Sequence, residues 1–137
     1  MNAETRRRVN DGDIVVDASA VIALLVGEPF TRFDPLRLPN ASISAVNLSE
    51  VLARLHEIGM PESDVAIAVA SLKLRVVAFD EPQARAAAQL RSVTRHAGLS
   101  LGDRACLALG DRLGWPVVTA DRVWARLDVG VEIVVIR

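Results

Sequence analysis

The sequence predicts an α/β domain in which a mainly parallel sheet of four to five strands is flanked by helices. Strand-like runs alternate with helical segments along the chain, which is typical of this class. The strand-like runs are also continuously apolar, as expected for parallel strands that are buried on both faces. A length of 137 residues with 51% hydrophobic residues is enough for one well-packed domain. We therefore expect one core and one site.

The front of the domain is predicted to form a strand, a sharp turn and a helix. Residues 14–16 are a short β-branched run that leads directly into Asp17. Residues 20–26 continue as an apolar helix, for which Ser19 is placed as the N-terminal cap. Glycine and proline residues interrupt the next stretch, so we expect a loop with one helical turn around residues 30–33.

The middle of the chain predicts two strands with two helices between them. Residues 41–44 are the second candidate strand, and residues 75–78 are the third. Residues 46–58 carry their apolar side chains on one helical stripe, and Gly59 ends this helix. Residues 61–72 begin with a proline followed by two acidic residues, a composition that favours the first turn of a helix.

The last part of the chain predicts further helices and two more strands. Asp80 caps an alanine-rich helix that Gly98 closes. Residues 100–113 form the next helix, after which a glycine and a proline turn the chain into a strand at residues 117–119. The last two predicted elements, a short helix and a strand, cover residues 122–127 and 132–136.

Composition and charge narrow the function and the compartment. The formal net charge of −1 gives no overall field that would attract nucleic acid, so any RNA contact needs a local arginine patch and bound cations. The single cysteine, Cys106, lies in an apolar helical segment and fits a buried thiol in a reducing cytoplasm. The apolar run at residues 18–26 is too short to span a membrane. We expect a cytoplasmic protein without a membrane anchor.

Two acidic residues follow strand-like runs directly or closely. Asp17 comes after residues 14–16, and Asp121 comes after residues 117–119. In a doubly wound sheet, ligands bind beyond the carboxyl ends of the strands, so both carboxylates are candidates for a site. The two could meet there if their strands are neighbours. The alternative, that each carboxylate only caps the following helix, stays open.

Asp103 lies on a crowded, apolar sector of its predicted helix. Its neighbours at spacings of three, four and seven are Cys106, Leu107 and Gly110. Burying an ionised carboxylate without a partner costs several kcal/mol or shifts its pKa, so a cation or a polar group should lie opposite. The alternative is a carboxylate satisfied by Arg104 or by backbone donors.

Glu50 taken alone resembles an ordinary solvated glutamate, because it points away from the apolar stripe of its helix. Asn47, one turn earlier, shares its face and could bind a phosphate or orient the carboxylate.

Four carboxylates that converge on one pocket repel one another, and hard divalent cations usually relieve this repulsion. Such a pocket is a site for Mg²⁺ or Mn²⁺, with one or two ions, which can activate water for the hydrolysis of a phosphodiester bond. His56 and His96 have no metal-binding neighbourhood, and the chain has neither a glycine-rich phosphate loop nor a Gly-x-Ser-x-Gly turn. Zinc, P-loop and α/β-hydrolase chemistry are therefore not expected.

The acidic residues and their flanking residues together resemble the PIN-domain ribonucleases of the VapC toxin family, from type II (VapBC) toxin-antitoxin systems. The resemblance covers the chain from Asp13 onward. It depends on four segments in this order: VVDASA at 15–20, NLSEV at 47–51, SLGDRACLAL at 100–109 and VTADR at 118–122.

The resemblance implies a PIN-like three-layer fold, a homodimer and an endoribonuclease site that depends on Mg²⁺ or Mn²⁺. It implies a VapB-type antitoxin as partner and RNA, whether tRNA, rRNA or mRNA, as substrate. It also implies that Glu50 belongs to the site despite its solvated pattern. The residues that match the family are the acidic quartet Asp17, Glu50, Asp103 and Asp121 and the auxiliary polar residues Thr119 and Asn47.

Three arginines are candidates for holding the RNA backbone, because forked guanidinium groups bind phosphates well: Arg104, Arg112 and Arg122.

Domain bounds follow from the same patterns. We assign residues 13–137 to the PIN domain. Residues 1–12 are polar and carry three consecutive arginines without periodicity, so we predict a flexible basic arm. This arm departs from the family, whose chains tend to begin almost at the first strand.

Two functions remain as hypotheses. The first is an RNA-cleaving toxin. The second is a catalytically weak PIN-fold binding module that acts in a regulatory complex with its antitoxin. A phospho-accepting receiver or phosphatase is disfavoured, because Ser19 stands where a second aspartate would be needed and Lys73 precedes its strand.

Overall fold

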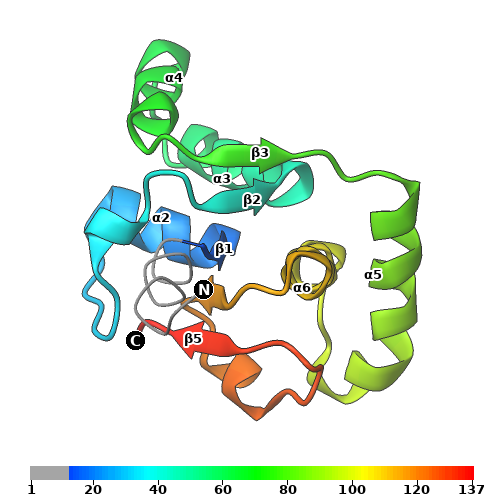
Figure 1. The fold of residues 1–137 in the computed structure, drawn as a ribbon. Helices are drawn as coiled ribbons and strands as arrows, with labels where there is room; N and C mark the ends of the chain where they lie inside the picture. Colours follow the sequence, from blue (N-terminus) through cyan, green and yellow to red (C-terminus); the bar gives the residue numbers. More distant parts are fainter. Residues whose placement is uncertain (1–12) are drawn as a thin grey trace, which may run out of the picture.

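The computed structural model describes residues 13–137, so the predicted basic arm at residues 1–12 lies outside the described residues. Five strands form one sheet in the order β3-β2-β1-β4-β5, and every neighbouring pair is parallel (Figure 1). The strands are β1 (Val15–Val16), β2 (Ser42–Ser44), β3 (Arg75–Val77), β4 (Val117–Thr119) and β5 (Ile133–Val135). The predicted α/β class and parallel sheet are confirmed.

Helices connect the strands and cover the sheet. The α-helices are α2 (Ala18–Val26), α3 (Ala45–Glu57), α4 (Glu62–Ser71), α5 (Glu81–Thr94) and α6 (Leu101–Leu113). Short 3₁₀ helices are η1 (Pro35–Arg37), η2 (Arg95–Ala97) and η3 (Arg122–Arg126). Within residues 13–137, no helix has the length and apolar character needed to cross a membrane.

The central strand β1 is buried on both faces, which makes the structure a three-layer fold. Val16 belongs to a core cluster that includes residues of α2 and α3. Val15 points to the opposite face and packs in a second cluster with Leu107 of α6 and the fully buried Trp124. In Figure 1, α6 lies between the sheet and α5, with which it packs. This burial explains why the strands are continuously apolar in sequence.

Two local predictions were wrong. The helical turn expected at residues 30–33 lies instead at η1, where Pro35 starts the turn and the Asp34 carboxylate accepts the Leu36 N–H at 3.0 Å. Ser19 does not cap α2, because Asp17 occupies the N-cap position and Ser19 lies within the first turn. The hydroxyl of Ser19 is therefore free to take part in the site described next.

Candidate active site

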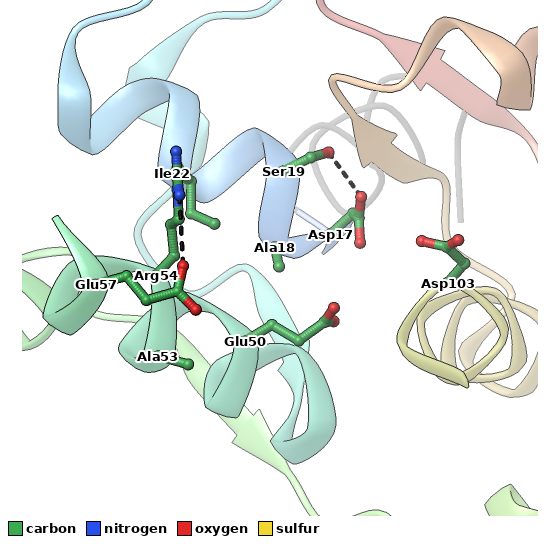
Figure 2. A pocket seen from close by; sticks show the side chains of 9 residues that line it. All are labelled: Asp17, Ala18, Ser19, Ile22, Glu50, Ala53, Arg54, Glu57 and Asp103. Carbon is green, nitrogen blue, oxygen red and sulfur yellow. Dashed lines mark hydrogen bonds and ion pairs between the residues drawn. The ribbon is translucent and has the colours of Figure 1, made fainter. Parts of the chain in front are cut away.

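A cleft of about 410 Å³ opens beside the carboxyl end of the central strand. Four acidic residues line it, and three of them, which come from three different places in the fold, are among the predicted acids. Asp17 directly follows β1, Glu50 lies in α3, and Asp103 lies in the first turn of α6. Figure 2 shows the three carboxylates directed toward a common gap. Folding therefore brings together three of the four predicted acids, and we call this pocket the acid cleft.

Asp17 is the most deeply buried of these acids, with only 4% of its surface exposed. Its Oδ2 atom accepts hydrogen bonds from the Ser19 hydroxyl at 2.7 Å and from the Thr119 hydroxyl at 3.0 Å. Although Asp17 stands at the N-cap position of α2, its side chain makes no capping hydrogen bond. Helix capping therefore does not account for this carboxylate.

The surroundings of Asp17 favour its protonated form. Burial raises the pKa of Asp17 to about 6, and the hydrogen bonds from Ser19 and Thr119 offset only part of this increase. The negative charges of Asp103 and Glu50 raise the pKa further. A positive ion in the acid cleft would reverse these electrostatic effects and favour the carboxylate.

Glu50 is held in the acid cleft by Asn47. The Asn47 amide donates one hydrogen bond to Glu50 Oε1 and another to the Gly102 carbonyl, both at 2.9 Å. Asn47 is fully buried, so it ties α3 to the start of α6. Burial raises the pKa of Glu50, the bond from Asn47 lowers it, and the charge of Asp103 raises it. Glu50 is exposed, but its hydrogen bond from Asn47 and the nearby charge of Asp103 distinguish it from an ordinary solvated glutamate.

Gly102 lets α3 and α6 approach closely at the acid cleft. A Cβ atom at this position would collide with the Glu50 carboxylate. The small size of Gly102 therefore makes room for a side chain of the site itself.

Asp103 combines a structural hydrogen bond with a place in the acid cleft. Its Oδ2 atom accepts the Ser100 N–H at 2.9 Å, and its own N–H donates to the Ser100 hydroxyl at 3.2 Å. This reciprocal capping box starts α6 and fixes the carboxylate. The other oxygen, Oδ1, has no hydrogen bond within the described part of the chain. A backbone donor therefore satisfies only part of this carboxylate.

Asp121 does not line the acid cleft, although β1 and β4 are neighbours. Its Oδ1 atom accepts the Val123 N–H at 3.0 Å and caps η3. It lines a neighbouring pocket of about 440 Å³. Thr119 connects the two places, because its hydroxyl donates to Asp17 and accepts the Asp121 N–H at 3.1 Å. Of the two roles considered for Asp121 in the sequence, the structure shows that its carboxylate caps the following helix.

The three arginines expected to hold RNA have different surroundings. Arg104 is buried, and its Nη1 donates to the Ala87 carbonyl at 2.9 Å, so it joins α6 to α5. Arg112 forms an exposed ion pair with Asp80 at 3.2 Å. Arg122 is exposed and lines the pocket that also contains Asp121. Of the three, only Arg122 lies in a pocket that adjoins the acid cleft.

Sequence reasoning missed three polar residues that line the acid cleft. Ser19 was interpreted as a cap, but its hydroxyl bonds to Asp17 and accepts the Ala120 N–H at 2.9 Å. Arg54 and Glu57 also line the cleft and form an ion pair at 3.4 Å. They follow Glu50 at helical spacings of four and seven, a signal that places all three on one face.

The donor set of the acid cleft suits a hard divalent cation. Residues 13–137 contain no group of three or more acidic, histidine or cysteine side chains already arranged around one ion position. Mg²⁺, however, commonly keeps several waters and binds through only one or two carboxylates. The carboxylate Oδ1 of Asp103 is unpaired, and the charges of Glu50 and Asp103 already act on Asp17. These are the groups that a cation would engage.

Fold and site together define a three-layer parallel α/β domain with an acidic cleft at the carboxyl edge of its sheet. The sequence profile of the PIN domain matches residues 14–130. The chain therefore belongs to the PIN domain family. No curated protein matches the sequence significantly.

Solved structures share this fold at low sequence identity. VapBC2 from Rickettsia felis, bound to a promoter DNA fragment, matches with a TM-score of 0.73 and 13% identity, covering 91% of this chain and 99% of that chain. DNA-bound VapBC from Salmonella typhimurium matches with a TM-score of 0.70 and 21% identity, covering 88% and 96%. VapC20 from Mycobacterium tuberculosis, a toxin that cleaves the sarcin-ricin loop, matches with a TM-score of 0.66 and 21% identity, covering 87% and 98%.

Proposed function

We propose that this PIN domain is the endoribonuclease toxin of a toxin-antitoxin pair and hydrolyses RNA phosphodiester bonds with Mg²⁺ or Mn²⁺. The observation that carries the proposal is the convergence of Asp17, Glu50 and Asp103 on one cleft from three separate elements. Membership of the PIN family and the fold shared with a toxin that cleaves the sarcin-ricin loop support it. Its substrate is RNA, whether tRNA, rRNA or mRNA.

In this mechanism, Asp17, Glu50 and Asp103 would hold one or two ions. A bound divalent ion supplies Lewis-acid stabilisation of the phosphate and lowers the pKa of a water molecule. The chain's own contribution is to orient the carboxylates. Ser19 and Thr119 fix one oxygen of Asp17.

Glu50 and Asp103 are oriented in the same way. Asn47 fixes one oxygen of Glu50, and the Ser100 N–H fixes one oxygen of Asp103. Each acid thus keeps a second oxygen for the ion, and none of them has to reorganise when substrate binds.

We assign Asp121 an auxiliary role, distinct from that of the other three acids. Its carboxylate caps η3, and its backbone N–H positions the Thr119 hydroxyl that bonds to Asp17. Asp121 would therefore support the ion site through Thr119.

The proposed partners follow from the solved complexes that share the fold. The similar proteins from Rickettsia felis and Salmonella typhimurium are VapBC pairs bound to DNA. We propose a VapB-type antitoxin as the partner of this chain and a homodimer as its assembly.

The test compares two aspartates on the same helix. Asp103→Asn should lower Mn²⁺-dependent cleavage of a structured RNA by at least about 100-fold, because metal-assisted stabilisation of the phosphate contributes several kcal/mol. Asp17→Asn should have the same effect. Asp111→Asn, an exposed position of α6 outside the acid cleft, should leave cleavage unchanged. Circular dichroism checks the fold of each variant. Equal cleavage by Asp103→Asn and Asp111→Asn would reject the proposal.

The alternative function is a catalytically weak PIN-fold binding module that acts with its antitoxin in a regulatory complex. The lack of a ready-made group of three ligands among residues 13–137 favours it. Calorimetry separates the two functions, because only the nuclease should take up Mn²⁺ in a way that depends on Asp103.

A further inference from the structure

A second pocket begins where the acid cleft ends. Ser19 lines both the acid cleft and the neighbouring pocket of about 440 Å³. The remaining residues of this second pocket are Ala120, Asp121, Arg122 and Arg137. The two hollows are therefore adjacent and share one side chain as their boundary.

The second pocket continues into a third one of about 400 Å³. Arg122 and Arg137 line both of them, and the third pocket adds Glu28, Phe30 and other residues of the loop after α2. The three pockets thus form a continuous series, which we call the track, from the acid cleft through Ser19 and the arginine pair to Phe30.

The formal charge changes sign along the track. Four carboxylates and Arg54 give the acid cleft a formal charge of −3. The side chains of Asp121 and the two arginines sum to a formal charge of +1 in the second pocket, and the side chains of the third pocket, with Glu28, sum to the same value. An anionic polymer would be repelled by the cleft alone, so its attraction must come from bound cations and from the basic end of the track.

The arginines of the track differ in how much of their charge is available. Arg54, in the acid cleft, is paired with Glu57 on the same helix at 3.4 Å. Arg137 is paired with Glu28 at 3.4 Å, and both side chains are nearly half exposed. Arg122 forms no hydrogen bond or ion pair through its guanidinium within residues 13–137. Arg122 is therefore the free cation nearest to the cleft in this series of pockets.

We infer that Arg122 and Arg137 form a phosphate-binding subsite for a single-stranded segment of the substrate, next to the nucleotide whose bond is cleaved. This inference rests on the proposed nuclease function and names the part of the substrate that the site requires. A flexible single strand can place successive phosphates in adjacent hollows. The half-buried Phe30 at the end of the track adds an apolar aromatic side chain of the kind that bases stack on in single-strand binding proteins.

The subsite is tested by the salt dependence of RNA binding. The probe is a fluorescein-labelled single-stranded RNA of mixed sequence and about 12 nucleotides, a length within the usual range for single-strand binding. All proteins carry Asp17→Asn so that the RNA stays intact, and fluorescence anisotropy in Mg²⁺ gives the affinity. Arg122→Ala with Arg137→Ala should weaken binding at least about 10-fold at low salt. The slope of log affinity against log salt should become shallower by about 1.4, because each of the two phosphates accounts for about 0.7 of it.

The matched control removes the same charge elsewhere. Arg85 and Arg91 are exposed residues of α5 that line none of the three pockets, and changing both to Ala should leave the slope unchanged. Equal slopes for the two double variants, or no saturable binding at all, would overturn the subsite. Equally tight, arginine-dependent binding of a duplex of the same length would overturn the single-strand assignment.

The subsite and the nuclease function can fail separately. Metal-dependent cleavage by the unmodified chain, together with binding that does not depend on Arg122 and Arg137, would overturn the subsite alone. Arginine-dependent binding without any metal-dependent cleavage would overturn the nuclease function and leave a single-strand binding surface.

Discussion

At the scale of single residues, the buried carboxylate of Asp17 lowers the stability of the fold and is also a proposed ligand of the metal ion. Its pKa rises from an ordinary value of 3.8 to about 6 in the fold, chiefly because the carboxylate is buried. Between these two values the folded state holds a proton that the unfolded state has released, so stability falls as pH rises. A shift of this size corresponds to about 3 kcal/mol once the pH is above 6. Without a metal ion, the fold thus contains a destabilising buried negative charge at the place where the ion would bind.

We therefore expect Asp17→Asn to stabilise the metal-free domain at neutral pH. The amide is neutral at every pH, and its oxygen can still accept the hydroxyls of Ser19 and Thr119. The gain in unfolding free energy should be near zero at about pH 4 and approach about 3 kcal/mol at about pH 7. Urea unfolding in a chelating buffer measures it. A gain that does not change with pH would contradict the raised pKa.

At the scale of elements, the packing of α3 on α6 sets the position of Glu50. Gly102→Ala should push the Glu50 carboxylate aside and lower cleavage at least about 10-fold, because small displacements of catalytic groups are costly. Stability should change by less than about 1 kcal/mol, since the displaced group is the end of a flexible side chain and alanine favours the helix. RNA cleavage assays and urea unfolding measure the two effects.

Gly110→Ala is the control for this variant. A Cβ atom there would collide with the buried side chain of Val117, and neither residue lines the acid cleft, so stability should fall by about 1–3 kcal/mol while the folded protein keeps its activity. A loss of stability without a loss of activity in Gly102→Ala would show that the position of Glu50 does not matter.

The start of η3 offers a second test at this scale. Asn caps helices about as well as Asp, so Asp121→Asn should keep cleavage within about threefold of the unmodified chain. Asp121→Ala should remove the cap and cost about 1 kcal/mol of stability. A loss of cleavage in Asp121→Asn as large as that in Asp103→Asn would place Asp121 among the ligands and refute its auxiliary role.

At the scale of the whole molecule, local signals predicted the elements well but could not assign every side chain. Apolar runs and helix caps predicted the five strands and the order of the helices, because strands that are buried on both faces are continuously apolar in sequence. Asp17 and Asp121 carry the same local signal, yet only Asp17 enters the cleft. The backbone N–H of Asp17 still donates to the Val118 carbonyl, as it would within the sheet. Asp121 lies two residues past the end of β4, and its N–H donates to the Thr119 hydroxyl instead.

Other side chains depended on partners far away in sequence. Glu50 has a solvated pattern on its own helix and is exposed in the fold, and only the packing of α3 against α6 brings its carboxylate beside Gly102 and Asp103. Arg104 was expected to hold the RNA backbone, but the approach of α5 supplies a carbonyl for its guanidinium and buries the side chain. The resemblance to the PIN-domain ribonucleases assigned Glu50 to the site, whereas the periodicity of its helix alone did not.

At the scale of the whole domain, metal binding should raise the melting temperature. An ion that binds only the folded state adds about 2.7 kcal/mol of stability at a concentration 100 times its dissociation constant. For a chain of this size, that corresponds to a rise in melting temperature of about 10 °C. We expect this rise with Mn²⁺ for the unmodified chain and for Asp111→Asn, and its loss in Asp103→Asn. Differential scanning calorimetry measures it.

The rise in melting temperature caused by Mn²⁺ should become smaller as the pH falls. The ion needs the ionised form of Asp17, so binding must release the proton that burial retains below a pKa of about 6. Each unit of pH below that value should weaken Mn²⁺ binding about 10-fold, and the rise in melting temperature should shrink accordingly. Above about pH 7 it should be constant. A Mn²⁺ effect that stays the same at pH 5 and pH 7 would mean that the ion binds elsewhere on the domain, without the buried carboxylate that ends the central strand.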